Sequence, residues 1–118
     1  MKTIFLCYDR CSTCKKAQKW LSDNNIEFEV RSITEDNPTY EELAEWLDKS
    51  GLEIRRFFNT SGMKYRELGL KDRVANDSKE ELLRLLSTDG MLVKRPLIIN
   101  DNAILTGFKE EEYRKALL

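Results

Sequence analysis

The segment Tyr8-Asp9-Arg10-Cys11-Ser12-Thr13-Cys14-Lys15-Lys16 joins two different sequence patterns. Before it stands the continuous apolar run 4–7, which is typical of a buried strand, and after it apolar residues at helical spacing predict a helix to about residue 24. The Cys-x-x-Cys pair therefore falls at a strand-to-helix junction. A helix start carries unsatisfied backbone N–H groups and roughly half a unit of positive charge, which favours a thiolate over a thiol. Lys15 and Lys16 would add to this effect, so we predict a lowered pKa for a cysteine here.

Two other interpretations of the cysteine pair are a zinc site and a chance spacing. Zinc sites need about four ligands, mostly Cys and His, whereas this sequence has no His and one further cysteine, Cys7. Cys7 lies in the apolar run, where a small thiol packs as a hydrophobic side chain. We therefore predict no metal site. For a Cys-x-x-Cys at the start of a βαβ unit, thiol or redox chemistry is favoured over chance spacing.

Length and composition indicate one globular domain without a membrane segment. The 118 residues suffice for a single modest core, and 41% of them are hydrophobic while 35% are charged. The net charge of −1 gives no basic field that would attract nucleic acid directly. No apolar run approaches the roughly 18 residues of a membrane span. Three cysteines without an export signal favour a reducing compartment, so we expect a cytoplasmic protein.

The order of predicted elements is β-α-β, a helical insertion, then β-β-α, which is an α/β fold with a single domain over 1–118. Strict alternation over 26–31 indicates a half-buried strand, and an apolar run indicates another over 97–100. Asp101-Asn102 predicts a two-residue hairpin turn of the kind that requires positive φ. A last helix is expected over 109–118.

The insertion, at about 35–89, contains helix signals. Thr39 to Glu42 fits a capping box, and Gly51 is a plausible stop for the helix that follows it. Ser78 opens another capped helix with a leucine-rich face. Shorter helical pieces are predicted over 52–58 and 65–70.

Four segments in order carry a recognisable signature. They are Cys11-Ser12-Thr13-Cys14-Lys15-Lys16-Ala17, then Phe58-Asn59-Thr60-Ser61-Gly62 with Tyr65-Arg66-Glu67-Leu68-Gly69-Leu70, then Met91-Leu92-Val93-Lys94-Arg95-Pro96-Leu97, and Gly107-Phe108-Lys109. Together they resemble the arsenate reductase-related family, which has a thioredoxin-like (glutaredoxin-like) fold and also contains the Spx-type regulators. The resemblance covers nearly the whole chain.

In the glutathione-coupled arsenate reductases of that family, the nucleophilic cysteine corresponds to Cys11, and three arginines hold the oxyanion. Arg95 matches one arginine, while Asn59 and Phe108 stand where the other two would be. A hydrogen bond to a charged group contributes roughly 1.5–3 kcal/mol, so this departure disfavours arsenate as the substrate. Neighbouring cations could substitute, but we interpret them as a solvated helix face; they are Arg55, Arg56 and Lys64.

The resemblance also implies a dithiol mechanism. Cys11 would attack an oxidised thiol or small molecule, and Cys14 would resolve the mixed disulfide. Pro96 would face the pair through a cis peptide bond. Arg95 either stabilises the Cys11 thiolate or is a surface charge, and charge proximity favours the former. The expected catalytic residues are thus Cys11, Cys14 and Arg95, and the expected substrate-binding residues are Ser12, Thr13, Lys15, Asn59, Pro96 and Gly107.

Three functions fit these residues. The first is a thiol oxidoreductase with no bound cofactor, reduced by glutathione or a thioredoxin-type protein. The second is an Spx-like regulator that binds the RNA polymerase α subunit and uses the pair as a redox switch. Spx-type proteins need a glycine near the end of the first inserted helix, where Gly51 stands, although an ordinary helix stop is an equally good interpretation. In the third interpretation, the cysteine pair is vestigial and the protein shares only the fold of the family.

Overall fold

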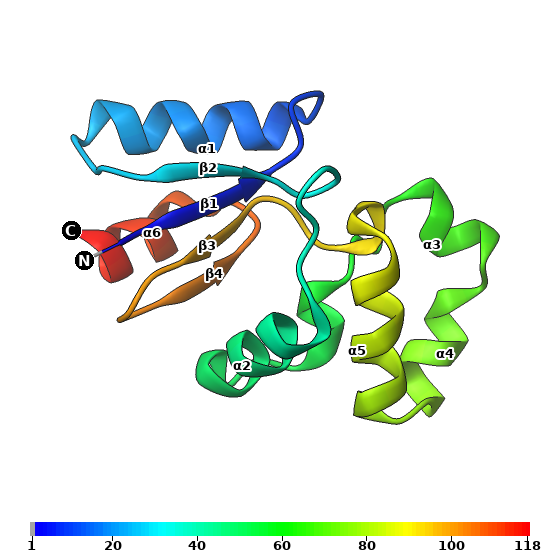
Figure 1. The fold of residues 1–118 in the computed structure, drawn as a ribbon. Helices are drawn as coiled ribbons and strands as arrows, with labels where there is room; N and C mark the ends of the chain where they lie inside the picture. Colours follow the sequence, from blue (N-terminus) through cyan, green and yellow to red (C-terminus); the bar gives the residue numbers. More distant parts are fainter. Residues whose placement is uncertain (1) are drawn as a thin grey trace. The chain divides into compact units, whose positions relative to one another are not determined.

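The computed structural model describes residues 2–118 and divides into two compact units. One consists of Met1–Ser32 with Arg95–Leu118 and is called the sheet unit below; the other, Ile33–Lys94, is called the helical unit. Figure 1 shows the strands in the sheet unit together with two helices, whereas the helical unit consists of helices and their connections. The single domain with an insertion at about 35–89 stays a prediction. The boundaries of the helical unit, Ile33–Lys94, lie close to those predicted for the insertion.

The sheet unit holds a four-stranded sheet in the order β2-β1-β3-β4. Its strands are β1 (Ile4–Cys7), β2 (Glu29–Ser32), β3 (Leu97–Ile99) and β4 (Ile104–Thr106). β1 is parallel to β2 and antiparallel to β3, and β3 forms a hairpin with β4. The parallel pair is connected by α1 (Ser12–Asp23), and the chain ends in α6 (Glu110–Leu117). The predicted β-α-β and β-β-α orders are both confirmed.

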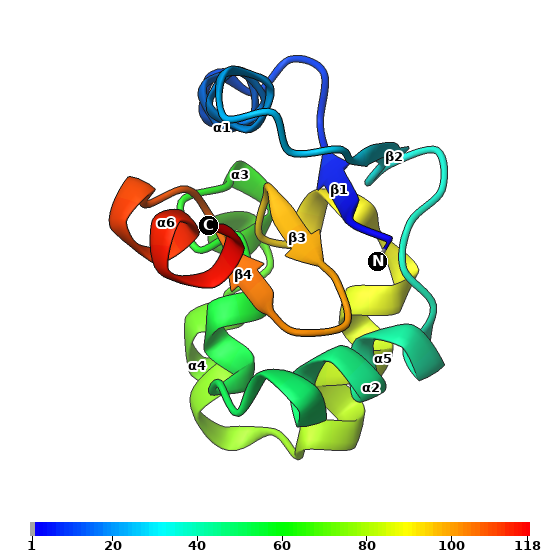
Figure 2. The same cartoon turned by 90° about the vertical axis from the view of Figure 1, so that its left-hand side faces the viewer.

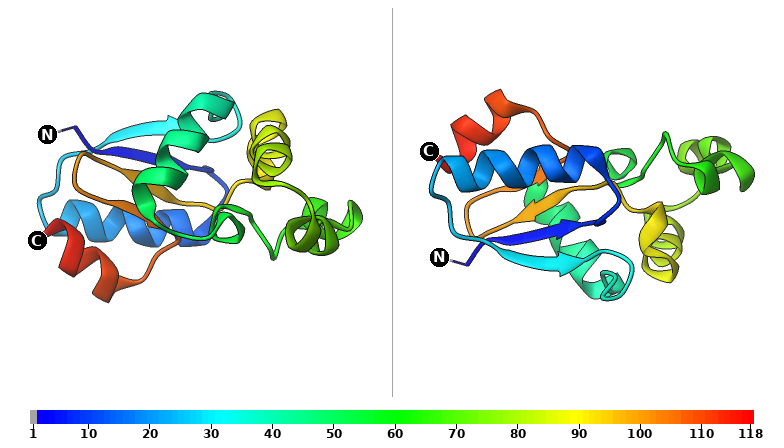
Figure 3. Two further views of the ribbon diagram at one scale, coloured as in Figure 1. Left: turned by 90° about the horizontal axis from the view of Figure 1, so that it is seen from below. Right: turned by 90° about the horizontal axis from the view of Figure 1, so that it is seen from above.

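The core of the sheet unit forms between one face of α1 and the sheet. Cys14, Ala17, Trp20 and Leu21 are the buried residues of α1, as their helical spacing predicts. In Figure 3, α1 runs alongside the strands, and Figure 2 views it nearly along its axis. Trp20 meets Tyr113 of α6 edge to face at 5.6 Å between ring centroids. Both helices therefore contribute to one core, which also contains Phe5 and Ile98.

Two local predictions in the sheet unit are wrong, and the first concerns the start of the second strand. β2 begins at Glu29 rather than at 26, because the chain is still closing the end of α1. Asn25 has φ 57°, its N–H donates to the Ser22 carbonyl, and the Ile26 N–H donates to the Leu21 carbonyl. This is a Schellman-type helix end. The alternation predicts a half-buried strand, whereas Val30, an apolar residue of that strand, is 53% exposed.

The hairpin turn is the second difference. Among the described residues only Asn25 combines a side chain with positive φ, so Asp101-Asn102 is not the predicted positive-φ turn. Instead the Asn100 side-chain oxygen accepts hydrogen bonds from the Asn102 and Ala103 N–H groups, at 2.9 and 2.8 Å. An asparagine side chain can close a turn in this way without left-handed backbone.

The helical unit contains α2 (Tyr40–Ser50), the 3₁₀ helix η1 (Ile54–Phe57), α3 (Met63–Glu67), α4 (Leu70–Asn76), α5 (Lys79–Thr88) and the 3₁₀ helix η2 (Gly90–Leu92). The capping box is confirmed: the Glu42 N–H donates to Thr39 Oγ1, and the Thr39 N–H donates to Glu42 Oε1. Gly51 ends α2 with φ 69°, and the Ser78 side chain caps α5. The helical piece predicted over 65–70 is two helices, because Gly69 breaks it at φ 61°.

The core of the helical unit is built by α2 and α5, which pack against each other. Their buried faces are Leu43, Trp46 and Leu47 on α2, and Leu82, Leu83 and Leu86 on α5. Each unit thus buries one of the two tryptophans, Trp20 in the sheet unit and Trp46 in the helical unit. Within residues 2–118, no helix is long and apolar enough to cross a membrane.

Candidate functional site

The two cysteines of the pair occupy different positions at the start of α1. Cys11 is the N-cap residue, with extended backbone (φ −95°, ψ 118°), and it is partly exposed. Cys14 lies one turn into the helix and is 3% exposed. The Tyr8 N–H donates to Cys14 Sγ at 3.5 Å. Neither sulfur is part of a disulfide bond in this structure.

The pKa of Cys11 is lowered from its ordinary value of 9.0, although burial alone would raise it. The groups that lower this pKa all donate to its sulfur: the Cys14 N–H, the Cys14 thiol, the Thr13 N–H and the Arg95 guanidinium. Hydrogen bonds to the charged form stabilise a thiolate. The predicted effect of the helix start is therefore present. The Lys15 and Lys16 side chains are exposed, and their contribution to the Cys11 pKa remains a prediction.

The pKa of Cys14 moves in the opposite direction, to about 12. Burial is the largest cause; the hydrogen bond to Cys11 and the charges of Cys11 and Cys7 raise it further, against the Tyr8 N–H, which lowers it. Burial also raises the pKa of Cys7. One thiolate among three neighbouring thiols is therefore favoured, and it resides on Cys11.

Arg95 and Pro96 enter this site from the start of β3. The Arg95 guanidinium lies over the Tyr8 ring, 5.0 Å from its centroid. The Arg95–Pro96 peptide bond is cis, as the resemblance implies. The Pro96 carbonyl accepts a hydrogen bond from the Gly107 N–H at 2.8 Å. The Gly107 carbonyl in turn accepts one from the buried Tyr113 hydroxyl at 2.6 Å.

The structure brings most of the predicted site residues into the sheet unit. Ser12, Thr13 and Lys15 lie in the exposed first turn of α1. Asn59 belongs to the helical unit, where its N–H donates to the Leu92 carbonyl at 2.8 Å. The roles of Ser12, Thr13, Lys15, Asn59, Pro96 and Gly107 in substrate binding, and of Cys14 in resolution, remain predictions.

Two functional positions had no clear signal in the sequence. Tyr8 supplies both the N–H to the Cys14 sulfur and the ring beneath Arg95. Tyr113 packs edge to face on Phe108 at 4.9 Å, so the position at which the resemblance expects an arginine holds a ring in an aromatic cluster. Only the place of Tyr8, directly after the first strand, could have indicated its role. In residues 2–118 no group of three or more His, Cys, Asp or Glu could hold a metal ion.

A sheet of this order, with two thiols at the start of the first helix and a cis-proline opening the third strand, defines a thioredoxin-like protein. The ArsC family model matches residues 6–116. The chain belongs to the ArsC family.

Three relatives illustrate the membership. A crystal structure of an ArsC family related protein from Bacteroides fragilis superposes with a TM-score of 0.95 at 52% identity, covering 98% of each chain. The uncharacterized protein YusI of Bacillus subtilis is 46% identical over 115 residues, 98% of each chain. The global transcriptional regulator Spx 2 of Bacillus anthracis is 25% identical over 107 residues, 91% of this chain and 80% of the regulator.

Proposed function

We propose that this protein is a thiol-dependent oxidoreductase that reduces a disulfide or another oxidised thiol, with Cys11 as the nucleophile. The observation that carries the proposal is the opposite shift of two neighbouring thiols: the pKa of Cys11 is lowered, while that of Cys14 is raised to about 12. Attack on a disulfide requires a thiolate, so the pair has a defined order of action. The partly exposed sulfur attacks first, and the buried one follows.

In the first step, the Cys11 thiolate attacks one sulfur of a substrate disulfide. A bond forms between Cys11 and that sulfur, the substrate S–S bond breaks, and the second substrate sulfur leaves as a thiolate. The N–H groups of Thr13 and Cys14 and the Arg95 guanidinium favour the attacking anion. They also lie around the reacting sulfur, where negative charge is shared during the exchange.

In the second step, Cys14 attacks the Cys11 sulfur, expels the bound substrate thiolate and forms the Cys11–Cys14 disulfide. Cys14 must first lose its proton, which the substrate thiolate released in the first step accepts. Formation of the mixed disulfide removes the Cys11 charge, and with it two causes of the raised Cys14 pKa. The remaining hydrogen bond from Tyr8 then favours the Cys14 thiolate. Glutathione or a thioredoxin-type protein returns two electrons and restores the two thiols.

Arsenate is a less suitable substrate for this site. Arg95 is the one position that retains the arginine expected from the resemblance, since Asn59 and Phe108 occupy the other two. Phe108 is also packed on Tyr113 and presents no donor to an oxyanion. We therefore assign an oxidised thiol, rather than arsenate, as the substrate class.

A regulatory function is the second candidate, and the similarity to Spx 2 favours it. The same thiol pair would then act as a switch, and the partner would be the RNA polymerase α subunit. Binding of the isolated α C-terminal domain that changes when the cysteine pair is oxidised would support this candidate. An oxidoreductase has no requirement for that contact.

The decisive experiment combines alkylation and trapping. Iodoacetamide should modify Cys11 selectively at neutral pH, and its rate should follow an ionisation below the ordinary cysteine value of 9.0. With glutathione disulfide, the Cys14→Ser variant should accumulate a mixed disulfide at Cys11, detected by mass spectrometry, whereas the wild type should pass on to the intramolecular disulfide.

Cys7→Ser is the matched control, because Cys7 is the third thiol and has a raised pKa. It should leave both the alkylation rate and the trapping unchanged. Cys11 that reacts no faster than a free cysteine, or a mixed disulfide at Cys7 or Cys14 instead, would contradict the proposal.

A further inference from the structure

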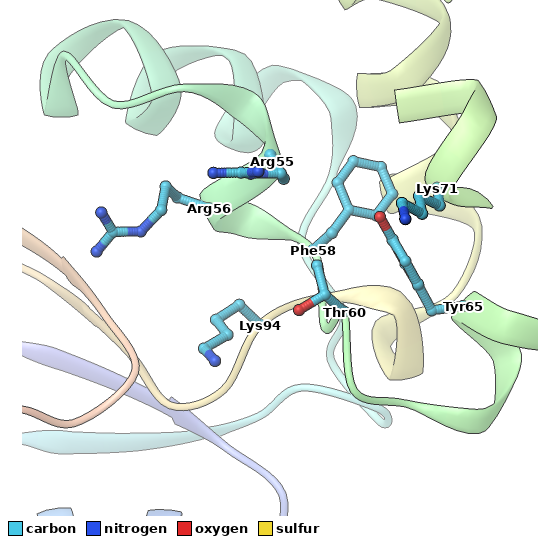
Figure 4. A pocket seen from close by; sticks show the side chains of 7 residues that line it. All are labelled: Arg55, Arg56, Phe58, Thr60, Tyr65, Lys71 and Lys94. Atoms are coloured by element: carbon cyan, nitrogen blue, oxygen red, sulfur yellow. The ribbon is translucent and has the colours of Figure 1, made fainter. Parts of the chain in front are cut away.

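The helical unit contains a hollow whose walls are strongly basic. Its volume is about 460 Å³, and four of its seven lining residues are cations. We call it the cationic pocket; its lining is Arg55, Arg56, Phe58, Thr60, Tyr65, Lys71 and Lys94. Figure 4 shows these side chains, which come from η1, the segment after it, α3, α4 and the segment that leaves η2. The solvated helix face predicted for Arg55 and Arg56 is therefore part of a concave surface.

The backbone fixes the two segments that carry most of this lining. Phe58 and Val93 form an antiparallel bridge, and on either side of it Lys94 N–H donates to the Phe57 carbonyl and Asn59 N–H to the Leu92 carbonyl, both at 2.8 Å. This pairing holds Lys94 beside the chain that leaves η1. The pocket is thus preformed rather than assembled from mobile loops.

Aromatic rings support the base of the pocket. Phe58 is 1% exposed and Tyr65 8% exposed, and the two rings meet edge to face at 6.2 Å. Buried rings hold α3 against the segment after η1. Leu70, fully buried at the start of α4, anchors the turn that carries Lys71.

Within the described part of the chain, three of the four cations of the cationic pocket are not paired with acidic side chains. No carboxylate is among its seven lining residues, and within residues 2–118 none of Arg55, Lys71 and Lys94 forms an ion pair. Arg56 has a partner of its own, so the inference rests on the other three. Like charges around a concave surface raise the local potential and attract anions. In a protein with net charge −1, this concentration is local.

A second hollow adjoins the first and differs in chemistry. Its volume is about 340 Å³, and it shares Arg55, Tyr65 and Lys71 with the cationic pocket. Its other lining residues are mostly apolar: Ile54, Val74 and Ala75, together with Glu53. A ligand that spans both would place a charged group among the cations and an apolar group against the second hollow.

We infer that the helical unit binds a small organic molecule that carries at least two negative charges of the phosphate type on an apolar or aromatic body. Both volumes lie in the range of small-ligand sites, roughly 300–1,000 Å³. Arginine and lysine are the side chains that recognise phosphate oxygens. A long polyanion such as duplex DNA fits less well, because the basic residues line a hollow and the net charge of the whole chain is −1.

The test is an NMR titration of the intact protein at low salt with three probes: ADP, inorganic diphosphate and adenosine. ADP contains both an anionic head and an aromatic body, diphosphate only the head, and adenosine only the body. We expect ADP to bind most tightly, diphosphate more weakly and adenosine least, with shifts confined to the amides around 54–60, 65–71 and Lys94. Raised salt should weaken ADP binding.

Variants locate the site. Arg55→Gln and Lys71→Gln should each weaken ADP binding about tenfold, the loss of one charge-assisted hydrogen bond. Arg84 is an exposed residue of α5 that lines neither hollow. Arg84→Gln removes the same charge there and should leave ADP binding unchanged. Cys11→Ser should also bind ADP as the wild type does, which separates this inference from the proposed thiol chemistry.

Four outcomes would overturn the inference. They are no ADP binding at millimolar concentration, equal binding of ADP and adenosine, an Arg84→Gln effect as large as that of Arg55→Gln, and duplex DNA binding that depends on these cations while ADP does not bind. Far-UV circular dichroism of each variant establishes that it is folded, and the exposed positions of Arg55 and Lys71 favour this.

Discussion

The sheet unit and the helical unit concentrate charge by different means. In the sheet unit, negative charge on Cys11 is favoured by backbone N–H groups, a neighbouring thiol and one guanidinium, all directed at a single sulfur. In the helical unit, positive charge is spread over the ends of flexible side chains around a hollow. Fixed backbone N–H donors can stabilise charge on a single reacting atom, whereas the long side chains of Lys and Arg can bind a ligand that carries its own charge. This difference is consistent with our proposals of thiol chemistry in the sheet unit and ligand binding in the helical unit.

The largest expected effect tests whether the chemistry depends on one sulfur. Cys11→Ser should lower reduction of a disulfide substrate on the order of a thousandfold, because a hydroxyl at this position cannot supply the thiolate. The turnover rate is measured in an assay in which a thiol reductant regenerates the enzyme. Arg55→Gln, in the helical unit, is the control and should retain full thiol reactivity. Turnover in Cys11→Ser close to that of the wild type would contradict the proposal that the chemistry depends on the Cys11 sulfur.

Gly90 provides the largest expected effect on stability, in the helical unit. A Cβ at Gly90 would lie 1.7 Å from the Ile33 carbonyl oxygen, so backbone must move. We expect Gly90→Ala to lower the free energy of unfolding by about 3 kcal/mol. Urea unfolding in a Trp20→Phe background measures this, because Trp46 then reports on the helical unit.

Gly51→Ala is the matched control for Gly90→Ala. Gly51 has φ 69° and open space around its Cα, so alanine there should cost only about 1 kcal/mol. An equal loss in both variants would show that backbone conformation, rather than close packing, governs the helical unit. Gly51→Asn should recover part of the loss, since Asn tolerates the left-handed region.

The raised pKa of Cys14 should make the free energy of unfolding depend on pH in the alkaline range. The pKa of Cys14 is raised from 9.0 to about 12, so between these values the unfolded chain has lost a proton that the folded protein keeps. The resulting stabilisation is complete below pH 9.0 and is lost as the pH rises towards 12. The lowered pKa of Cys11 acts in the opposite sense and contributes no slope above 9.0.

This difference is measurable by urea unfolding across the alkaline range. The free energy of unfolding of the wild type should fall with pH by up to about 1.4 kcal/mol per unit more than that of Cys14→Ser, which cannot ionise. Trp20, in the same core as Cys14, is the reporter in a Trp46→Phe background. Equal slopes in the two proteins would contradict the raised pKa.

The smallest expected effect concerns the ion pair between Lys64 and Asp89 in the helical unit. Burial raises the pKa of Asp89, but the Lys64 ammonium and the Met91 N–H outweigh it and lower that pKa below 3.8. Both side chains are partly solvated, so the pair should contribute about 0.5 kcal/mol. A double-mutant cycle with Lys64→Ala and Asp89→Asn measures it. The contribution should be present above pH 3.8 and decline as the pH falls further; a coupling that persists in acid would be inconsistent with it.

Local sequence signals determined a large part of this protein. The apolar run before Tyr8, the spacing of Ala17, Trp20 and Leu21, and the Thr39 capping box each depend on neighbours within one or two turns. Physical effects of that range can be interpreted without the fold. They predicted the element order and the position of the Cys-x-x-Cys pair at the junction of the first strand and the first helix.

Tertiary structure decided which groups act on the two sulfurs and where the cations gather. Arg95, which is distant from the cysteine pair in sequence, lowers the Cys11 pKa because β3 brings it to β1. The cationic pocket joins Arg55 to Lys94 through the pairing of Phe58 with Val93. Hydrogen bonds and Coulomb interactions depend on distances in space, and those distances between remote residues are fixed only by the packed chain.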